Sequence, residues 1–168
     1  MSRRDEIVEA AVAVLEAEGL DAVSMRRIAT ELGIQAPSLY KHVGGKEDIE
    51  AALQERALEG MTTALVAAGD DLERLGLAYR RWALDNPGLY EVATRRPLLR
   101  DRIRPGVEEA AAAPIVRVAG GDEHLARALW ALAHGLVDLE LRHRFPPGAD
   151  LDATWRTALG QLGGPAVR

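Results

Sequence analysis

The chain has 168 residues and a mass of 18.2 kDa, which suits one compact helical domain or a small domain joined to a larger regulatory domain. Hydrophobic residues make up 48% of the chain and charged residues 28%, a globular composition that argues against extended disorder. The formal net charge of -5 argues against a protein that coats nucleic acid non-specifically, because such proteins are usually strongly basic.

Cysteine usage and hydropathy limit the chemistry and the location of the protein. The chain has no cysteine, which excludes disulfides, thiolate nucleophiles and cysteine-ligated zinc. No apolar run is long enough to cross a membrane, and the charged opening Arg3-Arg4-Asp5-Glu6 does not have the form of a secretory signal. We therefore expect a cytoplasmic protein with no membrane partner.

The first two helices are expected to support a third. Residues 3–18 are predicted to form an amphipathic helix that Ser2 can cap and Gly19 ends. A second helix is predicted from Ser24, whose side chain can accept from the free amide groups of the first turn. The first helix is expected to pack beneath the second and third through Ile7, Val14 and Leu15.

Residues 24–46 predict a helix-turn-helix that binds DNA. Gly33 suits the left-handed position that ends the first of its helices, and Pro37 fits the first turn of the second. In that second helix, Leu39 and Val43 are expected to face inward. The outward face is then short, polar and cationic, and its members are Gln35, Ala36, Ser38, Tyr40, Lys41 and His42.

This stretch holds both lysines of the chain, Lys41 and Lys46, so its local charge differs from the chain total. Tyr40 and His42 can donate to phosphate oxygens, and Arg26 can bond guanine. Packing of Tyr40 inside the protein is the alternative. The predicted DNA-binding residues are Met25, Arg26, Gln35, Ala36, Pro37, Ser38, Tyr40, Lys41, His42 and Lys46.

A long fourth helix is expected from near Lys46, after the pair Gly44-Gly45 breaks the preceding one. Helices are then expected over residues 72–84 and 87–93, with Asn86 as the cap of the second. Between residues 95 and 104, five arginines alternate with apolar side chains, a pattern that favours an amphipathic surface element over a second nucleic-acid patch.

The remaining elements are also predicted to be helical, so the fold class is all-α. Pro105 can open a seventh helix, which Pro114 is expected to kink or divide. Residues 123–144 form a long apolar-periodic run, and residues 151–162 a last helix.

Core filling explains each of four aromatic residues singly, and a ligand cavity explains them as a set: Tyr79, Trp82, Tyr90 and Trp130. His134 and Asp138 lie four residues apart, but two side chains do not make a metal site, and pairing of Asp138 with Arg142 is the simpler expectation. We see no catalytic constellation, no metal site and no cofactor motif. The predicted ligand-binding residues are Tyr79, Trp82, Tyr90, Trp130, His134 and Asp138.

Two motifs resemble the TetR family of bacterial repressors. The run Ser38-Leu39-Tyr40-Lys41-His42-Val43, followed by Lys46, is similar to the recognition helix of that family. Trp130-Ala131-Leu132-Ala133-His134-Gly135 resembles a signature of one group of its C-terminal domains. The resemblance implies a DNA-binding domain at residues 1–46, an effector-binding and dimerisation domain at residues 47–168, and a homodimer formed through the eighth and ninth helices.

The sequence therefore predicts a transcriptional regulator rather than an enzyme. We expect a repressor that binds a double-stranded palindromic operator and is released by a small-molecule effector. A helical ligand-binding or scaffold protein with a vestigial DNA-binding head is the alternative, since the chain is acidic and Gly44-Gly45 departs from the usual residues at that junction. A helical enzyme is a third class, which turnover of a bound compound would favour.

Overall fold

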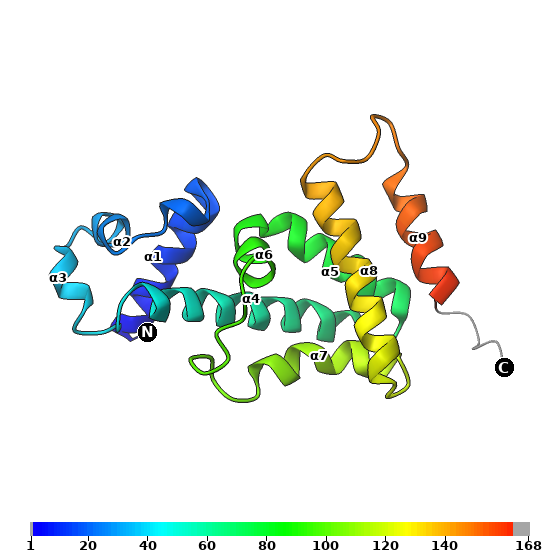
Figure 1. Ribbon diagram of the computed structural model, residues 1–168, viewed down its shortest axis with the longest axis horizontal. Helices are drawn as coiled ribbons and strands as arrows, with labels where there is room; N and C mark the ends of the chain where they lie inside the picture. Colours follow the sequence, from blue (N-terminus) through cyan, green and yellow to red (C-terminus); the bar gives the residue numbers. More distant parts are fainter. Residues whose placement is uncertain (1, 163–168) are drawn as a thin grey trace. The chain divides into compact units, whose positions relative to one another are not determined.

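The structure is a computed structural model that describes residues 2–162, and within them it consists of helices and connecting segments (Figure 1). The all-α prediction is confirmed. Residues 163–168, the end of the predicted C-terminal domain, lie outside the described residues. The elements are α1 (Arg3–Glu18), the 3-10 helix η1 (Leu20–Ala22), α2 (Met25–Glu31), α3 (Ala36–Leu39), α4 (Lys46–Ala68), α5 (Leu72–Asp85), α6 (Pro87–Thr94), α7 (Val107–Val118), α8 (Glu123–Leu141) and α9 (Leu151–Leu162).

The chain packs as two compact units, each with residues from two stretches of sequence. Unit 1 comprises Met1–Glu59 and Asn86–Val107, and unit 2 comprises Gly60–Asp85 and Glu108–Arg168. Residues 47–59 and 86–107 thus pack with the predicted DNA-binding head. The functional division at residue 46 remains a prediction, because a packing unit is not a functional domain. No helix among residues 2–162 is both long enough and apolar enough to span a bilayer.

The first helices of unit 1 enclose an apolar core. Its largest side chains come from α1, α2 and α3, and each is at most 1% exposed: Ile7, Val14, Leu15, Ile28 and Leu39. The predicted ends of α1 are confirmed, because Ser2 and Asp5 form a reciprocal capping box and Gly19 stands at φ +85° as the C-cap. Burial of these apolar side chains is what holds the short helices together.

Helix α6 is capped by a side chain that lies far away in the sequence. The carboxylate of Glu16 accepts from the backbone N–H of Gly88 at 3.0 Å and of Leu89 at 2.8 Å. Asn86 stands at the N-cap position, as expected, but its side chain makes no cap hydrogen bond, and Glu16 takes up the amides instead. Gly88 permits the close approach, because a Cβ there would lie 2.9 Å from Cγ of Leu15.

The arginine-rich stretch 95–104 lies along α4 without forming a helix. Gln54, which is 0% exposed, accepts from the N–H of Leu99 at 2.9 Å and donates to the carbonyl of Pro97 at 3.2 Å. Arginines of the stretch pair with α4 carboxylates, among them Arg96 with Glu50 at 2.8 Å. Further pairs are Arg102–Glu47, Arg104–Glu55 and Arg104–Glu59. These arginines are matched by carboxylates, as expected for an amphipathic surface element rather than a nucleic-acid patch.

In unit 2, α8 and α9 pack on α5. The approach is close at Gly76, where a Cβ would lie 2.6 Å from Cδ1 of Leu159. Two expectations about helix ends are wrong. Helix α7 begins at Val107 instead of Pro105; it is not divided at Pro114, and the alternative of a kink there stays a prediction. Helix α8 ends at Leu141 instead of residue 144, because His143 adopts a left-handed φ of +52°.

The buried amide of Gln54 is expected to stabilise unit 1. Replacing it by the apolar residue of similar size, Gln54→Leu, should lower the free energy of unfolding by about 1–3 kcal/mol, because the Leu99 N–H and the Pro97 carbonyl lose their partner. Urea denaturation followed by circular dichroism measures this change. The exposed Gln161→Leu is the matched control, and equal unfolding midpoints for the two variants would contradict the role of Gln54.

Candidate nucleic-acid interface

Local hydrogen bonds fix both ends of helix α2. The Ser24 hydroxyl accepts from the N–H of Arg27 at 3.2 Å, which confirms the predicted cap. Gly33 adopts φ +65°, and its N–H donates to the carbonyl of Thr30 at 3.1 Å. The N–H of Ile34 reaches back to the carbonyl of Ala29 at 2.9 Å, which completes the hydrogen-bonding pattern of a glycine-ended helix. The predicted turn between the two helices is therefore present.

The second helix of the motif is shorter than predicted. Helix α3 spans Ala36–Leu39 instead of continuing to Val43. The winding persists for one more turn, because the N–H groups of His42 and Val43 donate to the carbonyl of Leu39 at 2.9 and 3.1 Å. It then stops at the glycine pair, where Gly45 has a φ of +126°.

This turn separates its side chains into buried and exposed sets. Leu39 is 0% exposed and Val43 is 4% exposed, so both are part of the apolar core of unit 1. Tyr40 is 58% exposed, and Lys41 and His42 are also exposed. The alternative of a buried Tyr40 is excluded. A phenol, an amine and an imidazole thus lie at the surface beside an anchored apolar pair.

All of the predicted DNA-binding residues lie at the surface or at its edge. The half-buried ones are Met25, Ala36 and Ser38. The exposed ones are Arg26, Gln35, Pro37, Tyr40, Lys41, His42 and Lys46. We call these ten residues the reading face. Their role in DNA binding remains a prediction.

The cations of the reading face are not committed to carboxylates. Within residues 2–162, the side chains of Arg26, Lys41 and Lys46 form no ion pair. The neighbouring Arg27 differs, because it pairs with Glu18 at 2.5 Å and with Glu31 at 2.9 Å, and these partners raise its pKa. Arg27 is therefore a structural cation, whereas the reading face keeps its positive charge available for phosphate.

Sequence reasoning missed the residue that holds the glycine junction. The Asp48 carboxylate, in the first turn of α4, accepts from the N–H of Gly44 at 3.0 Å. The amide of Gly44 is thereby used within the protein. An acidic residue three positions into the helix was the available signal, since such residues often bond back to the preceding backbone.

The predicted ligand-binding residues belong to both packing units, and their role in ligand binding remains a prediction. Tyr79 and Trp82 of α5 are buried in unit 2, and Tyr90 is buried in unit 1. Trp130 is 47% exposed on α8 and stacks on His134 with ring centroids 5.6 Å apart. Asp138 pairs with Arg142 at 2.8 Å, as expected. Among residues 2–162, no three potential ligands from His, Asp or Glu come together as a metal site.

Substitutions of the neighbouring residues Leu39 and Tyr40 should differ sharply in their effect on the free energy of unfolding. Leu39→Ala should lower the free energy of unfolding by about 2–5 kcal/mol, because it empties a fully buried site. Tyr40→Ala should change it by no more than about 0.5 kcal/mol, because the side chain is exposed. Chemical denaturation measures both variants. A larger loss for Tyr40→Ala than for Leu39→Ala would show that the two faces are assigned the wrong way round.

Comparison with known proteins identifies both parts of the chain. Residues 7–53 match the family described as bacterial regulatory proteins, tetR family, and residues 72–162 match the tetracyclin repressor-like C-terminal domain. The HTH-type transcriptional regulator Rv0681 of Mycobacterium tuberculosis is 36% identical over 152 residues, which cover 82% of this chain and 70% of that protein. The HTH-type transcriptional regulator YobS of Bacillus subtilis is 28% identical over 162 residues, 86% of this chain and 82% of its own.

Solved structures show the same fold. The multidrug binding protein EbrR, solved in complex with imidazole, superposes with a TM-score of 0.73 at 25% identity, over 96% of this chain and 95% of that one. The two family matches and the relationship to Rv0681 agree with the helix-turn-helix geometry of α2 and α3. The chain therefore belongs to the TetR family of transcriptional regulators, which bind DNA and are not enzymes.

Proposed function

We propose that the protein is a ligand-responsive repressor that binds a palindromic operator as a homodimer and is released by a small molecule. The observation that supports this most strongly is the reading face, where Tyr40, Lys41 and His42 are exposed beside the buried Leu39 and Val43. A surface of this kind presents donors to DNA while its backbone is held by the protein core.

The roles within the reading face follow from chemistry. The Tyr40 hydroxyl and the His42 imidazole are donors suited to phosphate oxygens, which position a protein on the duplex. Lys41 can reach a phosphate or the edge of a guanine, and Arg26 can bond guanine with two parallel hydrogen bonds. Lys46 stands at the start of α4 and is suited to a phosphate there. Tyr40 and His42 would therefore determine the affinity for DNA, whereas Arg26 and Lys41 would determine which base sequence is recognised.

A single head of this size makes few base contacts, which is why we propose a symmetric dimer. Two recognition segments related by a two-fold axis read a palindrome when they lie about one DNA turn, roughly 34 to 36 Å, apart. Symmetry doubles the number of contacts without enlarging the head. It also makes the spacing of the two heads the property that an effector can change.

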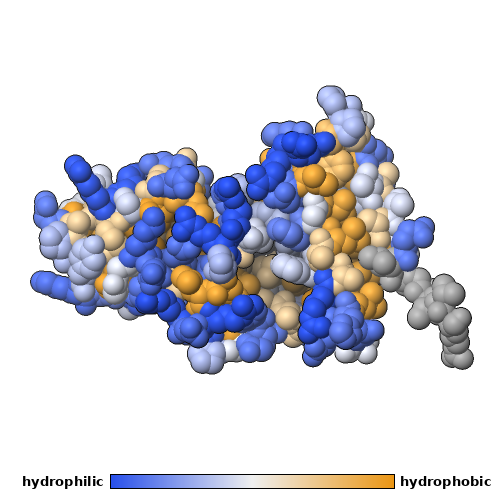
Figure 2. All heavy atoms as spheres, viewed as in Figure 1, coloured by the Kyte–Doolittle hydropathy of each residue, from blue (hydrophilic) through white to orange (hydrophobic). Residues whose placement is uncertain are grey.

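The surface of α8 supports its proposed place in the dimer interface together with α9. Trp130 and Leu139 on α8 are 47% and 41% exposed, and Figure 2 shows apolar side chains gathered on the surface over this helix. A Cβ added at Gly135 of α8 or at Gly160 of α9 would meet nothing within 4 Å. Large exposed apolar side chains beside open backbone are suited to close packing against a second copy.

For effector binding we propose the buried aromatic residues of α5. Tyr79 and Trp82 lie in unit 2, where Trp82 packs against the backbone of α4 at Gly60, so that a Cβ there would lie 3.0 Å from its Nε1. The similar protein EbrR is a multidrug binding protein, which supports an apolar or flat effector. The effector shifts operator occupancy only if it binds the released state more tightly than the DNA-bound state.

Selection of genomic fragments at defined salt, followed by sequencing, tests the proposed operator. We expect a palindrome to be enriched. In a gel-shift assay, Tyr40→Ala should then weaken binding to that palindrome about 30- to 150-fold, because each half-site loses about 1–1.5 kcal/mol. Val66→Ala is the matched control, since Val66 is 56% exposed and lies outside the reading face. No enriched sequence would favour the alternative, a scaffold with a vestigial head.

The proposed interface is tested at Gly135. Gly135→Arg should convert a dimer into a monomer of 18.2 kDa, because the new side chain would stand between the two copies. The fold of the monomer should be unaffected, since arginine favours a helix over glycine by almost 1 kcal/mol. Sedimentation velocity measures the mass, with the exposed Ala112→Arg on α7 as the control. An unchanged dimer in Gly135→Arg would place the interface elsewhere.

A further inference from the structure

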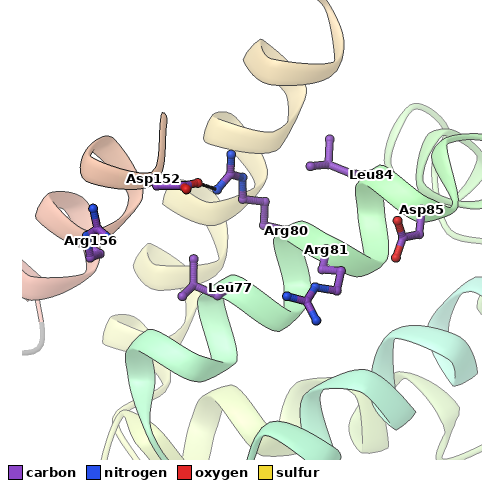
Figure 3. A pocket seen from close by; sticks show the side chains of 7 residues that line it. All are labelled: Leu77, Arg80, Arg81, Leu84, Asp85, Asp152 and Arg156. Atoms are coloured by element: carbon purple, nitrogen blue, oxygen red, sulfur yellow. Dashed lines mark hydrogen bonds and ion pairs between the residues drawn. The ribbon is translucent and has the colours of Figure 1, made fainter. Parts of the chain in front are cut away.

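In unit 2, helix α9 packs closely on α5 over only part of its length. The close approach lies in the C-terminal half of α9, where Leu159 meets the backbone of α5 at Gly76. Towards the N-terminal end of α9, a surface pocket of about 320 Å³ lies between the two helices (Figure 3). Its lining consists of Leu77, Arg80, Arg81, Leu84 and Asp85 from α5 with Asp152 and Arg156 from α9. The N-terminal half of α9 therefore depends on other contacts to hold it beside α5.

Arg80 supplies such contacts, because it bridges α5, α8 and α9. Its guanidinium forms two hydrogen bonds with the carboxylate of Glu140 on α8, at 2.9 and 2.8 Å. It also pairs with Asp152 on α9 at 2.5 Å, across the end of the pocket (Figure 3). The ring centroid of Trp155 on α9 lies 5.7 Å from the guanidinium, a cation–π contact, and its Nε1 donates to Glu140 at 3.3 Å. These four side chains form one network that joins three helices.

The centre of this network is largely shielded from water. The side chains of Arg80 and Glu140 are 15% and 13% exposed, and Trp155 is 1% exposed. The hydrogen bond to Glu140, followed by that to Asp152, raises the pKa of Arg80. Removing one partner of such a shielded pair is costly, because it leaves the other charge uncompensated. Asp152 is 71% exposed, so its bond to Arg80 contributes less.

The segment between α8 and α9 leaves the direction of α9 to these contacts. Residues 142–150 form turns without a helix. Their backbone hydrogen bonds within residues 2–162 are local: the N–H of Arg144 donates to the carbonyl of Leu139 at 2.9 Å, and that of Ala149 to Pro146 at 3.1 Å. Turns of this kind connect two helices without fixing the angle between them.

We propose that Arg80 is the positioning residue of the dimer surface, because it holds the N-terminal half of α9 beside α8 so that both helices can pack against a second copy. This inference rests on the proposed homodimer through α8 and α9. An interface with two-fold symmetry repeats every contact, so a displaced α9 weakens it twice. Arg80 lies on α5 and acts through Glu140, Asp152 and Trp155.

Arg80→Met tests this role, because methionine keeps an unbranched side chain but removes the bonds to Glu140 and Asp152. Arg81→Met is the matched control, since Arg81 is the next residue of α5, is exposed and forms no ion pair within the described residues. Sedimentation velocity at several protein concentrations gives the dissociation constant of the dimer. This constant should rise at least about tenfold in Arg80→Met and less than about twofold in Arg81→Met.

Hydrogen exchange followed by mass spectrometry separates positioning from general stabilisation. It is measured on chains that also carry Gly135→Arg, so that loss of the dimer does not itself change the exchange rates. Adding Arg80→Met should make the amides of α9 exchange at least about tenfold faster, whereas those of α7, in the same unit but outside the network, should keep their rate. Adding Arg81→Met should change neither helix.

Three results would overturn the proposal. These are unchanged exchange of α9 in Arg80→Met, equal acceleration of α7 and α9, and equal dimer dissociation constants for Arg80→Met and Arg81→Met. The second result would make Arg80 a stabiliser of the whole unit. If the unchanged protein is a monomer, the proposed homodimer fails, and the exchange of α9 alone then decides whether Arg80 positions that helix.

Asp152→Ala is the milder variant, which decides the question if Arg80→Met does not fold. It removes only the bond between Arg80 and Asp152, whose side chain is exposed. We expect the dissociation constant of the dimer to rise about two- to fivefold and α9 to exchange faster than in the unchanged chain. No change in either measurement would contradict the positioning of α9 by this network.

Discussion

The burial of Leu39 and Val43 is the constraint on which the DNA-binding head depends. Helix α3 has only four residues, and a helix of that length is not stable by itself in water. Because Leu39 and Val43 are at most 4% exposed, the core of unit 1 fixes the intervening residues. Tyr40, Lys41 and His42 must then face solvent. The reading face is thus a consequence of packing beneath it.

Ion pairing explains how an acidic chain can present a cationic surface. The net charge is -5, but many carboxylates are used inside the fold, as in the pairs between α4 and the stretch 95–104. The cations Arg26, Lys41 and Lys46 of the reading face have no such partners within residues 2–162. DNA bound at the reading face, as we propose, would meet this local charge, since phosphate affinity depends on the contact surface.

The features that could be predicted from the sequence are those that depend on residues close together in the chain. Ser24 and Gly33 could be placed correctly because a cap and a left-handed turn depend on the local backbone. The sequence could not reveal that Glu16 caps α6, because its partners Gly88 and Leu89 lie 72 and 73 residues away in the chain. The role of Gln54 was missed for the same reason, since its partners Pro97 and Leu99 lie 43 and 45 residues away. The reading face could be predicted because all ten of its residues fall within one short stretch, whereas the effector residues are spread over several helices and stay untested.

Hydroxyl-radical footprinting on a selected operator tests most directly whether two anchored heads read DNA together. The proposed function predicts two protected segments on one side of the duplex, with centres about 10–10.5 base pairs apart. At a protein concentration that just saturates the operator, both should disappear in Tyr40→Ala, which binds more weakly, while the protein remains folded. A single protected segment, or protection that Tyr40→Ala leaves intact, would contradict a dimer that reads DNA through the surface beside Leu39 and Val43.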